Sequence, residues 1–140
     1  MPMTLTAAIG ASASALNAER TRVEVAVSNL ANAESTRGPN GLPYRRREVV
    51  LETQGSPDFD GALGVRVAGV VEDPTPFQRI HDPSNADADA EGYVQFPNVN
   101  PQEEFVDLLS ASRAYQANLA AVNIIRDTSF ATYLRPRVRP

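Results

Sequence analysis

Apolar residues in the first part of the chain recur at a helical spacing. One row holds five of them, at intervals of seven, four and three residues: Ile9, Leu16, Val23, Val27 and Leu30. This pattern predicts a helix over residues 3–33 with a narrow apolar seam. Alanines are dense around the seam, and small residues there favour close contact with another helix over burial in a broad core.

A second helical pattern covers residues 101–133 near the end of the chain. Its start carries three signals, because Asn100 can cap the helix, Pro101 suits the first helical position and Glu103 stands where a capping-box acid belongs. The apolar row that follows has spacings of three, four and seven: Phe105, Leu108, Tyr115, Leu119, Val122 and Ile125. At about 1.5 Å per residue such a helix spans about 45 Å, more than a compact domain of this size requires.

The segment between the helical patterns, residues 37–100, holds most of the prolines and glycines. Three short runs in it have the composition of strands: residues 44–52, 64–72 and 91–96. In the second run, Val65, Val67 and Val71 are predicted to share one face. The sequence PNG at residues 39–41 indicates a turn.

Together these patterns predict a mainly α fold. Long N- and C-terminal helices pair as an antiparallel, coiled-coil-like hairpin, and a small, irregular, β-rich insert lies between them. The predicted segments are residues 1–36 and 37–100, then 101–140 with the second helix and a proline-containing tail. Two paired helices leave apolar surface exposed, which usually marks contact with partners. The alternative is a compact domain in which the insert covers both seams.

The end of the first helical pattern raises a separate question. In the sequence SNLANAEST, Asn32 is a candidate for the left-handed residue that often closes a helix. Asn29 stands one residue before Leu30 of the seam, where an amide is costly if it is buried without partners. We therefore expect Asn29 or Asn32 to make a hydrogen bond between segments. If both amides are solvent-exposed, the stretch is a plain helix end.

The composition excludes several kinds of chemistry. The chain has 140 residues and no Cys, and all 13 basic residues are Arg. A disulfide scaffold, a thiolate zinc site, a cysteine nucleophile and lysine Schiff-base chemistry are therefore excluded. The net charge of -4 argues against broad nucleic-acid binding, which needs a cationic surface, and the basic sequence LRPRVRP at residues 134–140 is too short to change this.

Candidate catalytic and metal-binding residues are few. His81 is the single histidine, and we interpret it as a solvated loop residue. The acids of residues 87–92, DADAEG, match the first half of a calcium loop, but Asn98 stands where the bidentate acid belongs. We interpret them as a polar turn and predict no catalytic site, no metal and no cofactor. The sequence RRRE at residues 45–48 indicates solvated charge on a strand, with contact to an acidic partner as the alternative.

No basic and apolar leader is visible, and no window holds the roughly 20 apolar residues of a membrane helix. The sequence thus predicts a cytosolic protein or one exported without a cleaved signal, and no membrane insertion.

Three stretches in the same order carry a family resemblance: SNLANAEST, GPNGLPYRRREVV and DADAEGYVQFPNVNPQEEFVDLLSASRAYQANLAAVN. With them the chain resembles the bacterial flagellar basal-body rod proteins, and most closely their short proximal-rod type. The residues that match the N-terminal motif of the family are Asn29, Leu30, Ala31 and Asn32. Those that match its C-terminal motif are Ser112, Arg113, Tyr115, Gln116 and Asn118. The all-arginine basic set and the arginine–proline tail depart from the family pattern.

The resemblance implies a structural protein of the bacterial flagellum and not an enzyme. Terminal helices of this family pack with copies of the chain and with other rod proteins into a tube around an export channel, and the central segment faces outward. The subunit is expected in the rod, in the periplasmic space, after export by the flagellar type III apparatus. Folding is expected to be coupled to assembly.

Three alternatives stay open at this point. One is another axial component of the rod and hook group. The second is an enzyme that uses Asp58, Asp60 or the acids of residues 87–91, and the third is a cytosolic helical adaptor.

Overall fold

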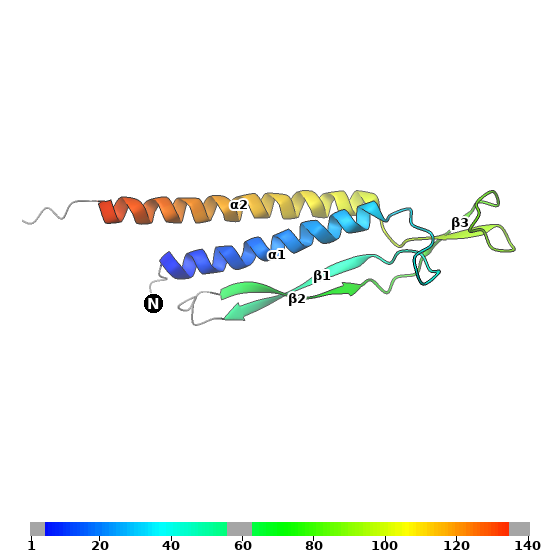
Figure 1. The fold of residues 1–140 in the computed structure, drawn as a ribbon, viewed down its shortest axis with the longest axis horizontal. Helices are drawn as coiled ribbons and strands as arrows, with labels where there is room; N and C mark the ends of the chain where they lie inside the picture. Colours follow the sequence, from blue (N-terminus) through cyan, green and yellow to red (C-terminus); the bar gives the residue numbers. More distant parts are fainter. Residues whose placement is uncertain (1–4, 56–62, 135–140) are drawn as a thin grey trace, which may run out of the picture.

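The computed structural model describes residues 5–55 and 63–134, with side chains up to residue 131. Within these residues the chain forms two long helices and four strands in an elongated molecule (Figure 1). The elements are α1 Leu5–Ala31, β1 Arg47–Gly55, β2 Leu63–Glu72, β3 Gln78–His81, β4 Tyr93–Phe96 and α2 Pro101–Leu134. The mainly helical fold with a small β insert is therefore confirmed.

The helices α1 and α2 lie side by side and run in opposite directions, and α2 extends past the start of α1 (Figure 1). Ala7, Ala18 and Asn29 of α1 are almost completely buried and lie 11 residues apart. An 11-residue interval returns to nearly the same face of a helix after three turns. The most buried row of α1 therefore differs from the predicted seven-residue row, and the coiled-coil character of the pairing stays a prediction.

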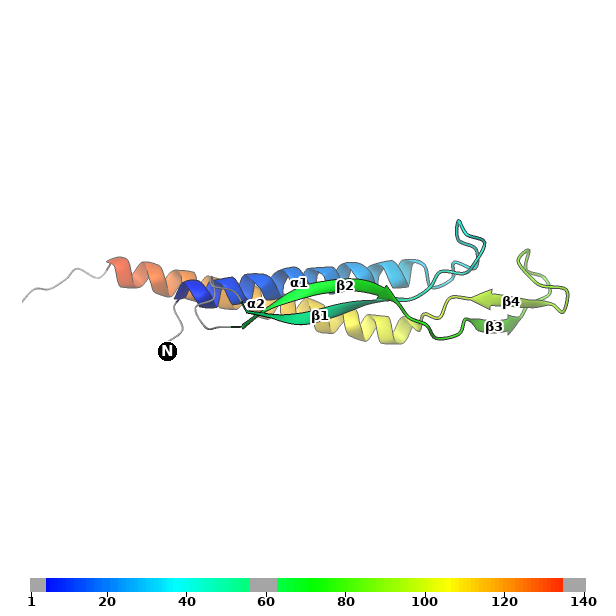
Figure 2. The same ribbon diagram turned by 90° about the horizontal axis from the view of Figure 1, so that it is seen from below.

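The antiparallel hairpin β1–β2 lies along α1 on the side opposite α2 (Figures 1 and 2). It pairs Arg47 with Glu72 at one end and Gly55 with Leu63 at the other, and Ala68 has no opposite residue because the register shifts between Val50 and Leu51. The insert thus covers α1 and leaves α2 uncovered. The alternative of an insert that covers both seams is wrong.

The valines of β2 differ in their exposure. Val65 and Val67 are half-buried, whereas Val71 is exposed. Gly69 is half-buried as well, so residues 65, 67 and 69 form one row that ends before Val71. The prediction of one shared face is therefore right for Val65 and Val67 and wrong for Val71.

A second antiparallel pair, β3–β4, projects beyond the end of the helices (Figure 2). The sequence did not predict β3, and His81 lies on this strand opposite Tyr93 instead of in a loop. Its ring lies edge-on to the Tyr93 ring, with the ring centres 5.0 Å apart. β3 is exposed along its whole length, so it lacks the apolar alternation that marks a half-buried strand.

The buried core is thin and consists mostly of small residues. The buried apolar residues among the described ones are Ala7, Ala18, Ala26, Val94, Val99 and Ala111. Alanines allow two backbones to approach closely but remove little apolar surface from water. Among the described residues, neither helix is apolar enough over a sufficient length to cross a membrane.

Candidate functional site

Asn29 lies in the last turn of α1 and is 1% exposed. Its Nδ2 donates to the backbone O of Arg47 at 2.9 Å and to Oε2 of Glu104 at 3.0 Å. Its Oδ1 accepts from the backbone N of Arg47 at 3.0 Å and from the Tyr44 hydroxyl at 2.9 Å. An asparagine amide has two donor hydrogens and two acceptor lone pairs, so its bonding capacity is fully used. The expected hydrogen bond between segments is therefore confirmed for Asn29, and the segments that it joins belong to the same chain.

Glu104 brings the start of α2 into the same site. It is 1% exposed, and its Oε1 accepts from Nε of Arg46 at 2.5 Å. The Arg46 guanidinium also pairs with Glu48, and it lies 3.4 Å from an oxygen of Asp73 and 3.6 Å from one of Asp107. Burial by itself would lower the pKa of Arg46, but the bonds to Glu104 and Glu48 raise it above its ordinary value. Arg46 therefore stays charged.

The end of β2 is tied to the same place through Asn98. The backbone N of Arg46 donates to Oδ1 of Asn98 at 2.7 Å, and Nδ2 of Asn98 donates to the backbone O of Asp73 and of Thr75, both at 3.1 Å. We call Asn29, Arg46, Asn98 and Glu104, with their bonded partners, the polar junction. It joins α1, β1, the end of β2 and α2, which are far apart in the sequence.

The start of α2 has the predicted cap. Oδ1 of Asn100 accepts from the backbone N of Gln102 at 3.1 Å, and its Nδ2 donates to Glu103 at 3.1 Å. Pro101 is the first helical residue. This cap fixes where α2 begins, and so it fixes the position of Glu104 one turn further on.

Asn32, the other amide of the N-terminal motif, makes only local bonds. Its Nδ2 donates to the backbone O of Ser28 at 2.8 Å, and its Oδ1 accepts from Oγ of Ser35 at 3.3 Å. Beyond it the PNG sequence forms the predicted turn, in which Gly41 has a φ of 77° and its N–H donates to Gly38 O at 2.9 Å. Asn32 thus bonds to the last turn of α1, and its left-handed conformation stays a prediction. The bond between segments belongs to Asn29.

The residues of the C-terminal motif lie near the middle of α2. Ser112, Tyr115 and Gln116 line a groove of about 310 Å³ between the helices, together with Val23 of α1. Nδ2 of Asn118 donates to the backbone O of Ala114 at 2.9 Å, and Arg113 is exposed. The structure thus brings part of this motif against α1, but none of it into the polar junction.

The predicted seam residues divide into two groups in the isolated chain. The half-buried ones are Ile9, Leu16, Val23, Leu30, Leu108, Tyr115, Val122 and Ile125. Val27, Phe105 and Leu119 are 49%, 56% and 43% exposed. Their role in contacts between subunits stays a prediction.

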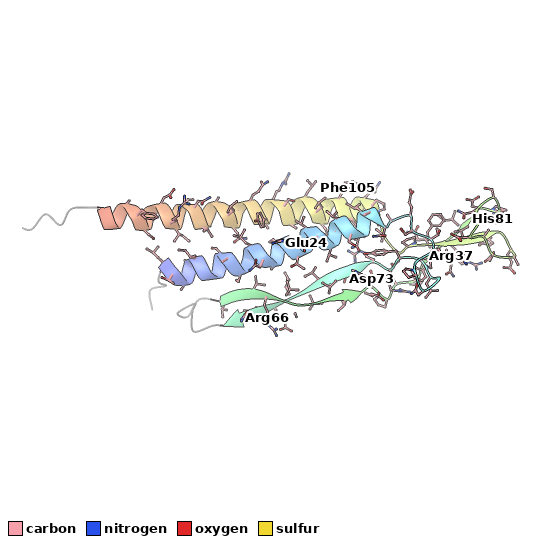
Figure 3. The ribbon with its side chains drawn as sticks, viewed as in Figure 1. Glu24, Arg37, Arg66, Asp73, His81 and Phe105 are labelled. Carbon is pink, nitrogen blue, oxygen red and sulfur yellow. The ribbon has the colours of Figure 1, made fainter. Side chains whose placement is uncertain are left out.

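One face of α2 carries large apolar side chains that nothing in the described chain covers. At about 100° per residue they share one side of the helix, and we call them the outer face of α2: Phe105, Val106, Leu109, Leu119, Ile124 and Phe130. Figure 3 shows Phe105 on the side of α2 turned away from α1. Such a patch marks an interaction surface.

The acids of residues 87–92 form the polar turn that the sequence predicts. Asp89 Oδ1 accepts from the backbone N of Tyr93 at 2.8 Å, and this bond is the first cause of a pKa below the ordinary value for Asp89. Among the described residues, no three His, Cys, Asp or Glu side chains are grouped to hold a metal ion. Asp58, Asp60 and the tail from residue 135 onward lie outside the described residues.

Sequence reasoning missed the roles of Glu104 and Arg46. From the sequence, Glu104 is only the second of two consecutive acids at the start of a helix, and Arg46 belongs to the basic run interpreted as solvated charge on a strand. A signal was present in their surroundings, since RRRE places several cations on one short segment and EE places two acids in the first turn of α2. Only the folded chain brings these two charges together.

Two family models match the chain, at the two helical segments that the polar junction joins. A model described as flagella basal body rod protein matches residues 9–39, and one described as flagellar basal body rod FlgEFG protein C-terminal matches residues 90–129. The first match covers most of α1 and the turn after it, and the second covers β4 and most of α2. These matches and the helical hairpin define a flagellar basal-body rod protein.

Individual relatives narrow the class further. The chain is 44% identical over 119 residues to the flagellar basal-body rod protein FlgC of Salmonella typhimurium, covering 85% of this chain and 88% of that protein. It is 46% identical over 121 residues to FlgC of Escherichia coli O6:H1, with coverage of 85% and 88%. It is 44% identical over 137 residues to FlgC of Bacillus subtilis, with coverage of 86% and 91%. The chain belongs to the FlgC family and is a structural subunit of the flagellar basal-body rod.

Proposed function

We propose that the chain polymerises through α1 and α2 into a tube of helices around the flagellar export channel. The outer face of α2 is the observation that carries the proposal. Ile124 and Phe130, near the far end of that face, are 66% and 62% exposed, and neither α1 nor the β1–β2 hairpin covers this side. Burying large apolar side chains is worth about 1.5–3 kcal/mol each, so helices of neighbouring subunits would gain much by packing there.

In this arrangement residues 1–36 and 101–140 form the assembling part, and residues 37–100 face outward. The β1–β2 hairpin supports this division, because it covers one side of α1 and leaves α2 free (Figure 1). The residues of the two predicted seams and of the two family motifs are the proposed contacts with copies of the chain and with other rod proteins. The role is mechanical and involves no catalysis.

The proposed location is the rod within the periplasmic space, reached through the flagellar type III export apparatus. The thin, alanine-rich core supports coupled folding and assembly, because it leaves the isolated subunit with little buried apolar area. The isolated chain is then expected to be less helical than the assembled one, or to aggregate.

The test compares an exposed residue of α2 with an exposed residue of the β1–β2 hairpin. Ile124→Asp places a charge in the outer face of α2, and Gln54→Asp adds the same charge on β1, away from that face. We expect Ile124→Asp to abolish swimming and to be missing from purified basal bodies, while Gln54→Asp retains both. If Ile124→Asp is incorporated as well as the unchanged chain, the outer face of α2 does not carry assembly.

A further inference from the structure

A basic pocket lies between the end of α1 and the start of β1. The loop that forms it is closed by backbone bonds, from Gly38 N to Leu42 O at 2.7 Å and from Tyr44 N to Ser35 O at 2.9 Å. The pocket has a volume of about 540 Å³. We call it the arginine pocket, after the three arginines on its wall: Arg37, Arg45 and Arg47.

These arginines are held in place but are poorly neutralised. Arg45 lies over the Phe77 ring at 4.3 Å and donates to the backbone O of Asp73 at 2.9 Å. The Arg47 guanidinium lies 5.7 Å from the centre of the Tyr44 ring. Neither makes an ion pair with a carboxylate in the part of the chain that the structure describes, although Glu72, opposite Arg47 in the strand pairing, also lies on the pocket wall. Arg37 pairs with Asp87 at 3.4 Å. With three arginines and one carboxylate on its wall, the pocket presents a net positive surface on a chain of net negative charge.

The same chain carries a segment of opposite charge. Residues 37–47 contain four arginines and no acid, whereas residues 82–91 contain four acids and no base. We propose that the arginine pocket binds the 82–91 loop of a second copy of this chain. Carboxylate bonds to clustered arginines are strong and directional, and they are a recurring way of recognising acidic segments. This inference rests on the proposed function, because it names one contact of the polymer.

The loop is already shaped to be bound. Asp82 Oδ1 accepts from Oγ of Ser84 at 2.6 Å, and Asp89 bonds the backbone of Tyr93 and pairs with Arg79 at 3.0 Å. These bonds occupy Asp82 and Asp89 and fix the turn. Glu91 is exposed, and its carboxylate has no bonded partner among the described residues. Glu91 is therefore the first candidate to enter the pocket of a neighbour, and a rigid loop loses little entropy on binding.

The positions of pocket and loop fit a contact between copies displaced along the long axis. The loop connects β3 to β4, which project beyond the helices (Figure 2), and its Asp87 bonds to Thr36 at 2.8 Å and pairs with Arg37 of the same chain, whereas Glu91 is exposed and free to meet a second copy. A copy shifted along the long axis would bring its 82–91 loop to the arginine pocket of the next copy. Two different surfaces meet in this contact, so it is heterologous and can propagate into a helical array.

A charge swap tests the contact in assembled basal bodies. Arg47→Glu and Glu91→Arg alter exposed side chains that make no hydrogen bond or ion pair among the described residues, and each alone is expected to weaken incorporation into basal bodies about tenfold or more. The double variant restores the pair and is expected to recover incorporation and swimming. Arg66→Glu changes the charge equally on the outer side of the β1–β2 hairpin and serves as the matched control (Figure 3). If the double variant is as defective as the singles, the proposal is overturned.

Cross-linking identifies the occupant. Because the chain has no cysteine, Leu42→Cys at the pocket and Glu91→Cys at the loop introduce single thiols. Cells that produce both variants as separate chains are expected to yield a disulfide-linked dimer in their basal bodies, and either variant alone is not. If Leu42→Cys is not incorporated, Asn40→Cys replaces it.

The outcomes separate this inference from the proposed function. Incorporation of both cysteine variants without a dimer overturns the pocket contact and leaves polymerisation intact. A cross-link from Leu42→Cys to a different rod protein also overturns it, because the occupant is then not a second copy. The proposed function fails on a different observation, which is incorporation of Ile124→Asp into basal bodies as efficient as that of the unchanged chain.

Discussion

Arg46 and Glu104 are 58 residues apart in the sequence, and their side chains form an ion pair of 2.5 Å in the interior of the polar junction. Removing one partner of a buried pair leaves the other charge without compensation and typically costs about 3–5 kcal/mol. We expect Glu104→Gln to lower the free energy of unfolding by about 3 kcal/mol. This is the low end of that range, because Arg46 still pairs with Glu48 and lies near Asp73. The measurement is urea unfolding of the dilute purified chain, monitored by circular dichroism. All samples contain the same concentration of trimethylamine N-oxide, which favours the folded state.

The matched control for this pair is Glu103→Gln. Glu103 is adjacent in the sequence but exposed, and its side chain accepts a hydrogen bond from the cap residue Asn100. It should lose less than about 1 kcal/mol. Equal losses for Glu103→Gln and Glu104→Gln would show that helix-end charge, and not the ion pair, sets the effect.

Asn29 gives a second prediction, since it satisfies four hydrogen-bonding groups at once. Asn29→Ala leaves the Arg47 backbone and one oxygen of Glu104 without this partner in a buried site. Each buried group left unsatisfied costs about 1–3 kcal/mol, so we expect a loss of at least about 2 kcal/mol in the same urea assay. Asn32→Ala, which removes only local bonds, should cost clearly less. A larger loss for Asn32→Ala would contradict the assignment.

The alanine row of α1 predicts intolerance to larger side chains. Ala18 is 1% exposed, and a leucine there has no space beside the neighbouring elements. Overpacking of this kind costs about 1–3 kcal/mol, so Ala18→Leu should lower the urea midpoint. Ala13→Leu, on an exposed position of the same helix, should leave it nearly unchanged. If both variants behave alike, α1 does not depend on close approach at Ala18.

The cap of α2 predicts a smaller and local effect. Asn100→Ala removes the acceptor for the backbone N of Gln102 and should cost about 1 kcal/mol. Amide hydrogen exchange should speed up in the first turn of α2. Asn123→Ala, in the exposed middle of the helix, is the control and should leave exchange in that turn unaltered.

Asp73 predicts how stability depends on pH. Its pKa lies below the ordinary value, first because the backbone N of Thr75 donates to it at 2.8 Å, and further because of the Thr75 hydroxyl and Arg46. A pKa lowered in the folded state stabilises the fold above the ordinary value near 4, and this contribution is lost as the pH falls through the lower folded value. The urea midpoint should therefore fall below about pH 4.

The variant for this prediction is Asp73→Asn. It should lower the midpoint at pH 7 and flatten the decline below pH 4, because the titrating group is absent. Asp127→Asn, exposed on α2, is the control. If the plot of urea midpoint against pH for Asp73→Asn runs parallel to that of the unchanged chain, Asp73 does not make this contribution.

The sequence by itself determined the elements whose signals are local. The spacing of apolar residues predicted both long helices. Asn100, Pro101 and the PNG sequence marked a helix start and a turn, because caps and turns depend on a few consecutive residues. Three stretches in order also sufficed to indicate the family.

Only the tertiary structure decided what depends on contacts between distant segments. β3 has no apolar alternation and exists because β4 supplies its hydrogen bonds. The buried row of α1 follows Ala7, Ala18 and Asn29, because the β1–β2 hairpin and α2 both pack against that helix. The partner of Glu104 is likewise set by where the folded chain places Arg46. The sequence pattern around a charged residue on a helix or strand is the same whether its side chain faces water or a buried counter-ion. Only the burial of that side chain in the folded structure distinguishes these two cases.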